Sequence, residues 1–197
     1  MNKFYALIDK LNAAPAADRG RVEQDIWSIY GVEKAILALD MSQFSLSVRR
    51  SGILPYVGLI RRMQVLTGPI VDGHNGEVVK YVADNMMAVF DDASDAVNAA
   101  VAINRSLIAT PIVTDAASLS VAIGIDYGRF VLIPGQDCFG DPVNIAYKLG
   151  EDLARPGEVL ISASAREQLD ASLEDTLVEQ QVSVSGLQFL AYRVGYN

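Results

Sequence analysis

Two aspartates stand where largely apolar stretches end. Asp40 directly follows the unbroken apolar run 35–39, and Asp84 lies between the stretches 78–82 and 86–90. Two carboxylates without histidine or cysteine suit Mg²⁺ or Mn²⁺, which commonly take one or two carboxylates and complete their shell with water and substrate phosphates. Either acid alone is more typical of a turn or a helix cap. The pair therefore predicts a metal site only if the fold brings both acids together.

The surrounding pattern indicates how the two acids would meet. The run 35–39 predicts a strand buried on both faces, and apolar residues at helical spacing from Ile53 to Ile70 predict a long helix bent at Pro69. The stretches 78–82 and 86–90 predict a hairpin whose three-residue turn contains Asp84. Because the first strand and this hairpin are natural neighbours in a sheet, both acids are expected at one edge.

The remaining elements predict a mixed sheet. A helix capped by Asp92 follows the hairpin, and Asp141-Pro142 begins another. A second hairpin is expected from 119–126 and 130–133, around 127–129. A strand is expected at 158–161, and a helix begins at the capping box 164–167. Two further strands are expected at 177–184 and 188–194. Helices interleaved with hairpins predict an α+β fold with a ferredoxin-like mixed sheet. Residues 1–34 are interpreted as a two-helix N-terminal extension and residues 35–197 as the main domain.

Two further features are candidates for binding. Met41-Ser42-Gln43-Phe44 follows Asp40 at a predicted strand-to-helix turn, where backbone N–H groups can receive phosphate oxygens. Lys80 lies inside an otherwise apolar strand, and alternation places it on one face with Val78 and Val82. Such a lysine either lies at a sheet edge with its amine in water or points at a ligand, and the edge interpretation is favoured without further context.

Composition excludes several classes of function. There are 16 Lys and Arg against 24 Asp and Glu, a formal net charge of −8, which argues against nucleic-acid or anionic-membrane partners. The single cysteine, Cys138, and the single histidine, His74, exclude an intramolecular disulfide and zinc sites built on several such residues. No apolar run approaches the roughly 20 residues of a membrane span, so a cytoplasmic protein is expected.

Three segments together resemble the class III adenylate/guanylate cyclase catalytic domain. They are 40–44 (DMSQF), 76–90 (GEVVKYVADNMMAVF) and 139–146 (FGDPVNIA), and they preserve the order and approximate spacing of the family's motifs. The resemblance runs from about residue 35 to residue 194 and leaves only the N-terminal helices outside it. A diguanylate cyclase is disfavoured, because the chain has no Gly-Gly-Asp/Glu-Glu-Phe hairpin.

The resemblance implies an adenylate cyclase that converts ATP to 3′,5′-cyclic AMP and pyrophosphate. It implies two Mg²⁺ or Mn²⁺ ions per site, held at Asp40, Met41 and Asp84, and in-line displacement at the α-phosphate. The positions that match Lys80 and Asp137 read the base and favour ATP over GTP; Asp137, rather than its neighbour Cys138, lies seven residues before Asn144.

In the family, Asn144 would orient the ribose, and Ser42, Gln43 and Phe44 would contact the substrate. Each site also draws residues from two chains, so the resemblance implies a homodimer.

Three positions depart from the family pattern. Lys148 stands where the family has an arginine one turn after Asn144, and an ammonium cannot offer a planar bidentate fork to phosphoryl oxygens. Ser185 stands where many relatives have a phosphate-binding lysine, and Ala83 replaces a glycine before the second acid. A poorer fit of the cation is expected to cost about 10- to 1000-fold in rate. The alternative hypothesis is therefore a weakly active or inactive cyclase-like nucleotide-binding module.

Overall fold

The computed structural model describes residues 3–42, 53–113, 118–184 and 187–196. Its strands are β1 (Gly31–Met41), β2 (Gly76–Val82), β3 (Asn85–Phe90), β4 (Val121–Ile133), β5 (Asp137–Phe139), β6 (Val159–Ser162), β7 (Leu177–Val184) and β8 (Leu187–Val194). Its helices are α1 (Lys3–Ala13), α2 (Ala16–Tyr30), α4 (Ile53–Gly73), α5 (Ala93–Ala109), α6 (Asp141–Tyr147), the π-helical turn η1 (Lys148–Leu153), α7 (Ala163–Arg166) and α8 (Ala171–Glu174). None of the helices in these described ranges is both long and apolar enough to cross a lipid bilayer.

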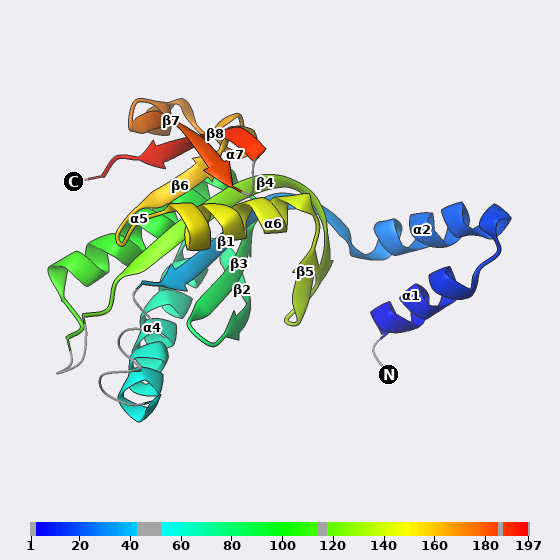
Figure 1. Cartoon of the computed structure of the whole chain (residues 1–197), viewed down its shortest axis with the longest axis horizontal. Helices are drawn as coiled ribbons and strands as arrows, with labels where there is room; N and C mark the ends of the chain where they lie inside the picture. Colours follow the sequence, from blue (N-terminus) through cyan, green and yellow to red (C-terminus); the bar gives the residue numbers. More distant parts are fainter. Residues whose placement is uncertain (1–2, 43–52, 114–117, 185–186, 197) are drawn as a thin grey trace.

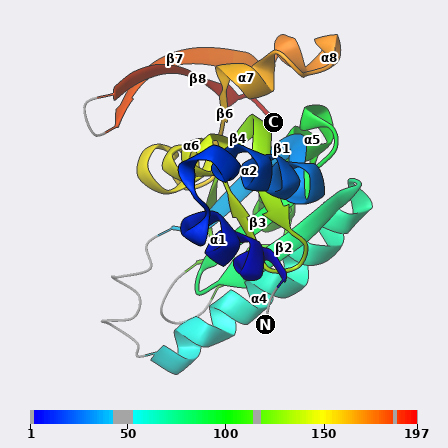
Figure 2. The same cartoon turned by 90° about the vertical axis from the view of Figure 1, so that its right-hand side faces the viewer.

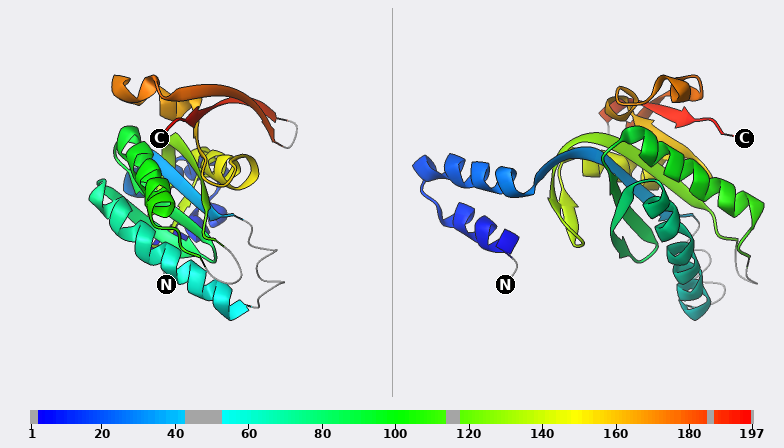
Figure 3. Two further views of the ribbon diagram at one scale, coloured as in Figure 1. Left: turned by 90° about the vertical axis from the view of Figure 1, so that its left-hand side faces the viewer. Right: turned by 180° about the vertical axis from the view of Figure 1, so that it is seen from behind.

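One mixed sheet organises the molecule. Its strand order is β2-β3-β1-β4-β6-β8-β7, with β5 paired to β4, and β4 and β6 run parallel while the other pairs are antiparallel. Helices α4 and α5 cover one face, and α6 covers the other (Figures 1 and 3). The predicted α+β class with a ferredoxin-like mixed sheet is confirmed.

Strand β1 is covered by helices on both faces of the sheet, as its apolar run predicts. Ala35, Leu37 and Leu39 belong to the core beneath α4 and α5, whereas Ile36 and Ala38 belong to the core beneath α6. All five are at most 1% exposed. Successive side chains of a strand point to opposite faces, so only a strand covered on both sides can be apolar at every position.

The second predicted hairpin is wrong, because residues 121–133 form the single long strand β4. Gly128 pairs with Lys34 in the ladder between β1 and β4 instead of making a turn. A Cβ at Gly128 would lie 2.9 Å from Cγ of Pro142 at the start of α6, so the glycine allows close approach of the helix. The chain reverses later, through residues 134–136, where Gly135 has φ +65°.

The first hairpin is confirmed, but its turn and its alternation differ from the prediction. Val82 pairs with Asn85, which leaves a two-residue turn of Ala83 and Asp84, and Ala83 adopts φ 50°. The pairing of β2 with β3 shifts between Val78 and Lys80, which is a β-bulge. Val78 therefore packs toward α4 and α5, while Lys80 lies opposite Met87, whose side chain belongs to the core beneath α6. The expectation that Lys80 and Val78 share a face is wrong.

The N-terminal helices α1 and α2 form a hairpin that extends to one side of the sheet (Figures 1 and 2). Phe4, Val22 and Ile26 are buried in a cluster with Val131 and Ile133 of β4. The strand after them begins at Gly31, four residues before the predicted start. The division of the chain at residue 34 stays a prediction.

Two cap predictions have different outcomes. The Asp92 carboxylate accepts a hydrogen bond from the Ser94 amide, 2.6 Å, as the predicted cap of α5 requires. The capping box at Ser164 is wrong, because α7 begins at Ala163 and its cap is Ser162, whose hydroxyl accepts from the Ala165 amide at 3.0 Å.

Candidate active site

Asp40 and Asp84 meet at one end of the sheet, as the sequence predicts. Asp40 pairs with Asn85 in the ladder between β1 and β3, next to the turn that contains Asp84. The Met41 amide donates a hydrogen bond of 3.2 Å to the Asp84 carbonyl. The Asp84 backbone is therefore linked to the residue that follows Asp40, although 44 positions separate Asp40 from Asp84 along the chain.

Like charges dominate the electrostatics at this end of the sheet. Burial, followed by the negative charges of Asp84 and Glu151, raises the pKa of Asp40 from 3.8 to about 7. The Tyr56 hydroxyl of α4 donates to Oδ2 of Asp84 at 3.1 Å, and burial together with Asp84 raises the pKa of Tyr56 well above its usual value. Among the described residues no Lys or Arg pairs with Asp40 or Asp84, so a bound cation would relieve the repulsion between these acids.

Carboxylate oxygens are the ligands that Mg²⁺ and Mn²⁺ prefer, so the donor chemistry of Asp40 and Asp84 fits such an ion. In the part of the chain that the structure describes, no group of three or more His, Cys, Asp or Glu side chains is arranged to hold a metal. Two carboxylates would need substrate phosphates and water to complete the shell, as is common for Mg²⁺.

Sequence reasoning missed Glu151, the third acid of this region. It belongs to η1, and its Oε1 accepts a 2.9 Å hydrogen bond from Nδ2 of Asn85. Burial, Asp152 and Asp84 raise the pKa of Glu151, while the hydrogen bond from Asn85 lowers it. A separation of 66 residues between Asn85 and Glu151 leaves no local pattern that reveals the contact.

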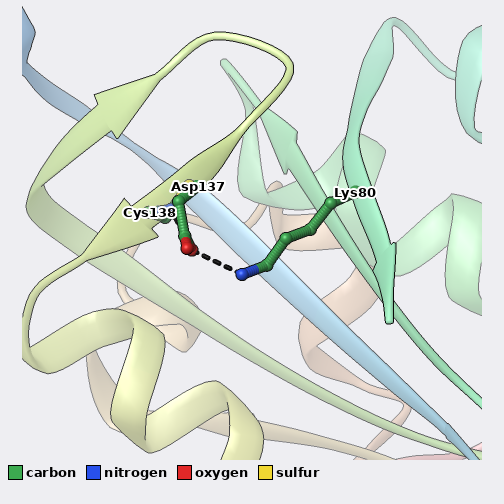
Figure 4. A network of polar contacts seen from close by, with 3 residues as sticks. All are labelled: Lys80, Asp137 and Cys138. Atoms are coloured by element: carbon green, nitrogen blue, oxygen red, sulfur yellow. Dashed lines mark hydrogen bonds and ion pairs between the residues drawn. The ribbon is translucent and has the colours of Figure 1, made fainter. Parts of the chain in front are cut away.

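Lys80 and Asp137 form an ion pair between β2 and β5 (Figure 4). Nζ of Lys80 lies 2.6 Å from Oδ1 of Asp137, and the side chains are 27% and 28% exposed. The same oxygen accepts a 2.9 Å hydrogen bond from the Cys138 amide. The Cys138 thiol is buried, and this burial, with the nearby Asp137 charge, raises its pKa to about 12, so the thiol stays protonated at neutral pH.

The bulge in β2 gives Lys80 its direction. Without the extra residue, strict alternation would keep Lys80 on the face of Val78, toward α4 and α5. With the bulge, Lys80 lies on the face where β5 reaches the sheet and pairs with Asp137. This polar pair is more than a quarter exposed, so it is available to a ligand with both donor and acceptor groups.

Asn144 lies on α6 with its side chain exposed, and Lys148 begins η1 one turn later. The backbone N–H of Lys148 bonds to the carbonyls of Asn144 and Ile145, where the α-helix passes into the π-helical turn. Among the described residues Lys148 forms no ion pair. π-helical turns occur frequently at functional sites, which makes Asn144 and Lys148 candidates for contact with a ligand.

Of the other predicted site residues, Ser42 and Met41 belong to the described part of the chain. Ser42 follows β1, and its amide donates to the Ser120 carbonyl at 2.9 Å. Met41 is 3% exposed, so its side chain belongs to the core. Gln43, Phe44 and Ser185 lie outside the described residues.

The proteins with similar sequences include a putative adenylate cyclase. No family model matches the chain. "Putative adenylate cyclase 3" of Rhizobium meliloti is 31% identical over 134 residues, which is 68% of this chain and 22% of the relative. Three uncharacterised mycobacterial proteins are 31% identical over 130 residues, 66% of this chain and 32% of each relative. The chain thus spans about a fifth to a third of the length of these curated relatives.

Solved structures agree over nearly the whole domain. The adenylate/guanylate cyclase/hydrolase from Silicibacter pomeroyi superposes with a TM-score of 0.68 at 27% identity, over 85% of this chain and 98% of its own. The catalytic core of a rhodopsin-guanylyl cyclase with converted specificity, in complex with ATPαS, gives a TM-score of 0.69 at 22% identity, over 83% and 97%.

The fold is therefore that of a nucleotidyl cyclase domain. By fold and by sequence similarity, the chain is a domain of the class III adenylate/guanylate cyclase type, which confirms the resemblance seen in its motifs.

Proposed function

We propose that the protein is an adenylate cyclase, which converts ATP to 3′,5′-cyclic AMP and pyrophosphate at the interface of a homodimer. The convergence of Asp40 and Asp84 at one end of the sheet carries this proposal. Two half-buried acids joined through the Met41 amide form an oxygen-rich, negatively charged site that suits a metal-bound triphosphate. The similarity to nucleotidyl cyclases supports the same assignment.

Asp40 and Asp84 are the residues that would hold the divalent ions, with Met41 beside them. Bound there, Mg²⁺ or Mn²⁺ would lower the pKa of the 3′-hydroxyl and neutralise charge on the triphosphate. The role of the two carboxylates is to fix the reacting end of the nucleotide so that the 3′-oxygen faces the α-phosphate. The bond from that oxygen to phosphorus would form as the bond to pyrophosphate breaks, and the hydroxyl proton would pass to solvent water.

Lys80 and Asp137 are proposed to recognise adenine. Asp137 can accept a hydrogen bond from the exocyclic amino group, while Lys80 can donate to a ring nitrogen. Their ion pair holds both groups at a spacing of 2.6 Å before the base arrives, and their side chains are still more than a quarter exposed. Guanine presents a carbonyl oxygen where adenine presents the amino group, so Asp137 disfavours GTP through repulsion between acceptors.

Asn144 and Lys148 are proposed to act on the nucleotide bound mainly by the partner subunit. Asn144 is exposed on α6, and Lys148 has no ion pair among the described residues, which suits a pair of groups directed at another chain. Asn144 would orient the ribose, and Lys148 would stabilise negative charge on the phosphoryl oxygens during displacement. The site is then incomplete in a monomer.

The proposal is tested by incubating purified protein with Mn²⁺ and either ATP or GTP and measuring both cyclic nucleotides. We expect cyclic AMP to exceed cyclic GMP, and we expect Asp84→Ala to reduce cyclic AMP formation at least 100-fold, because a metal ligand is lost. Glu179→Gln, an exposed position on β7, is the matched control. Wild-type product no higher than that of Asp84→Ala removes the assignment.

The second candidate is a nucleotide-binding module with little or no turnover. The specific observation that favours it is Lys148, whose ammonium cannot form the bidentate contact of an arginine. It predicts Mn²⁺-dependent ATP binding by calorimetry without product in the cyclase assay. Ready turnover by the unmodified protein excludes it.

A further inference from the structure

The N-terminal helical hairpin contacts the strand that carries Asp137. Phe4 of α1 is 5% exposed and packs with Val131 and Ile133 near the end of β4. Its ring lies nearly parallel to that of Phe139, with an interplanar angle of 6° and centroids 6.0 Å apart. Tyr30 of α2 meets the same Phe4 ring edge-on at 5.1 Å. Phe4 therefore links both N-terminal helices to the β4–β5 hairpin.

Strand β5 is held by Cys138, which is buried in the core beneath α6, and by Phe139, which stacks on Phe4. It consists of the three residues 137–139 and, in the described sheet, pairs only with β4, where Phe139 lies opposite Val131 and Asp137 opposite Ile133. Phe139 is 44% exposed, so one side of its ring is open while the other faces Phe4. Phe139 and Asp137 lie opposite Val131 and Ile133, which belong to the cluster around Phe4, whereas Cys138 between them points to the other core. The contact of Phe139 with Phe4 therefore restrains the side of β5 that carries Asp137.

The ion pair at the other end of β5 depends strongly on position. Oδ1 of Asp137 lies 2.6 Å from Nζ of Lys80 on β2, and β5 and β2 are not paired in the described sheet (Figure 4). A hydrogen bond weakens steeply when its distance or angle departs from the optimum, so a shift of about 1 Å in β5 weakens the contact of Asp137 with a base bound at this pair.

We propose that Phe4 and Phe139 are a positioning pair, through which the N-terminal helices set the place of Asp137 and hence the affinity of the base-recognition site. This inference rests on the proposed function in one respect, the assignment of Lys80 and Asp137 to the base. It extends that function by giving residues 3–30 a defined effect on nucleotide selection. Neither aromatic residue touches the nucleotide, so both act through β5.

The experiment compares Phe4→Ala, Phe139→Ala and the double variant with wild type. Ile29→Ala is the matched control, because Ile29 is an apolar side chain of the same helical hairpin that is 62% exposed. Phe4→Leu keeps most of the apolar volume without the flat ring, and it replaces Phe4→Ala if that variant does not fold. The first measurement is amide hydrogen exchange of residues 134–139 in the absence of nucleotide.

The second measurement is the affinity for 3′-deoxy-ATP with Mn²⁺, determined by calorimetry. This probe lacks the attacking hydroxyl and cannot be cyclised, so its binding is independent of turnover. Loss of one aromatic pair is expected to speed exchange of residues 134–139 by about 3- to 10-fold. We expect a similar rise in Kd for 3′-deoxy-ATP, no change in Ile29→Ala, and a double variant no worse than either single one, because the two rings act through one contact.

The outcomes separate this inference from the proposed function. Faster exchange at residues 134–139 together with weaker 3′-deoxy-ATP binding supports the positioning pair, even if ATP is never turned over. Unchanged exchange in Phe4→Ala overturns it, and so does faster exchange with an unchanged Kd. Additive effects in the double variant also overturn it. Absence of cyclic AMP from wild type contradicts only the adenylate cyclase assignment.

Discussion

Replacing Asp40 by asparagine should stabilise the metal-free protein at alkaline pH. The unfolded chain loses the Asp40 proton near pH 3.8, whereas the folded protein keeps it to about pH 7. Over this interval the folded state binds the extra proton, so the free energy of unfolding falls as the pH rises. Asparagine carries no charge at any of these pH values, and it removes this dependence while keeping nearly the same shape.

The size of the effect follows from the two pKa values. A difference of about 3 between folded and unfolded pKa corresponds to about 4 kcal/mol once the pH exceeds both. Because Asp40 is only half-buried, solvent screening reduces this to about 2 kcal/mol at pH 8. A little over 1 kcal/mol of this decrease in the free energy of unfolding occurs between pH 5 and pH 8.

Urea unfolding in EDTA at pH 5 and pH 8 measures this directly. We expect Asp40→Asn to be more stable than wild type by about 2 kcal/mol at pH 8, and the advantage to shrink by about half at pH 5. Glu179→Gln, at an exposed position, should show no such difference. Adding Mn²⁺ at pH 8 should raise the midpoint of wild type but not that of Asp40→Asn. An Asp40→Asn protein no more stable than wild type at pH 8 refutes the reasoning.

Three other substitutions test separate parts of the structure. Lys148→Arg should raise turnover about 10-fold or more with unchanged metal dependence, because a planar fork matches phosphoryl oxygens; equal or lower activity means that the site is built around lysine. Gly128→Ala should destabilise the fold by about 1–3 kcal/mol in urea unfolding, since the new Cβ would lie 2.9 Å from Pro142. The control is Gly20→Ala in α2, where a Cβ would meet no atom within 4 Å, and it should be neutral or slightly stabilising. Ser162→Ala should cost about 1–3 kcal/mol, because it removes both the cap of α7 and the hydroxyl that bonds Asp126; a loss below 0.5 kcal/mol in the same assay contradicts that account.

The parts of the fold that were predicted correctly are those in which runs of strand-forming residues and the turn residues between them decide the structure. The unbroken run 35–39 required a strand covered on both faces, and β1 is buried between two layers. The C-terminal hairpin, predicted at 177–184 and 188–194, agrees with β7 and β8 within one residue. Burial of a continuous apolar surface accounts for β1, whereas none of the side chains described in β7 is buried, and the turn-type residues Ser185-Gly186 in the sequence separate β7 from β8.

The errors arose where tertiary contacts override local turn preferences. Tyr127-Gly128-Arg129 has a turn-like composition, yet Gly128 is extended in β4 because Pro142 needs the space above it. The bulge at Val79 cannot be inferred from alternation, since one extra residue leaves the composition of the strand unchanged. At the site, Asp40 and Asp84 were found from their places at strand ends. Glu151 was missed because only the packing of η1 brings it to Asn85.

The buried Asp126 and the half-buried Asp40 show how a structural carboxylate differs from one that can bind a ligand. Asp126 is 2% exposed, and it accepts hydrogen bonds from the Ser162 hydroxyl and from the Tyr127 amide at 2.8 Å, which offset part of the cost of its burial. Asp40 faces two like charges instead, and no cation among the described residues pairs with it. The raised pKa of Asp40 means that its ionised form lowers the stability of the fold. Binding of a cation to the folded protein would offset this loss of stability. This contrast favours Asp40, rather than the more deeply buried Asp126, as the functional acid.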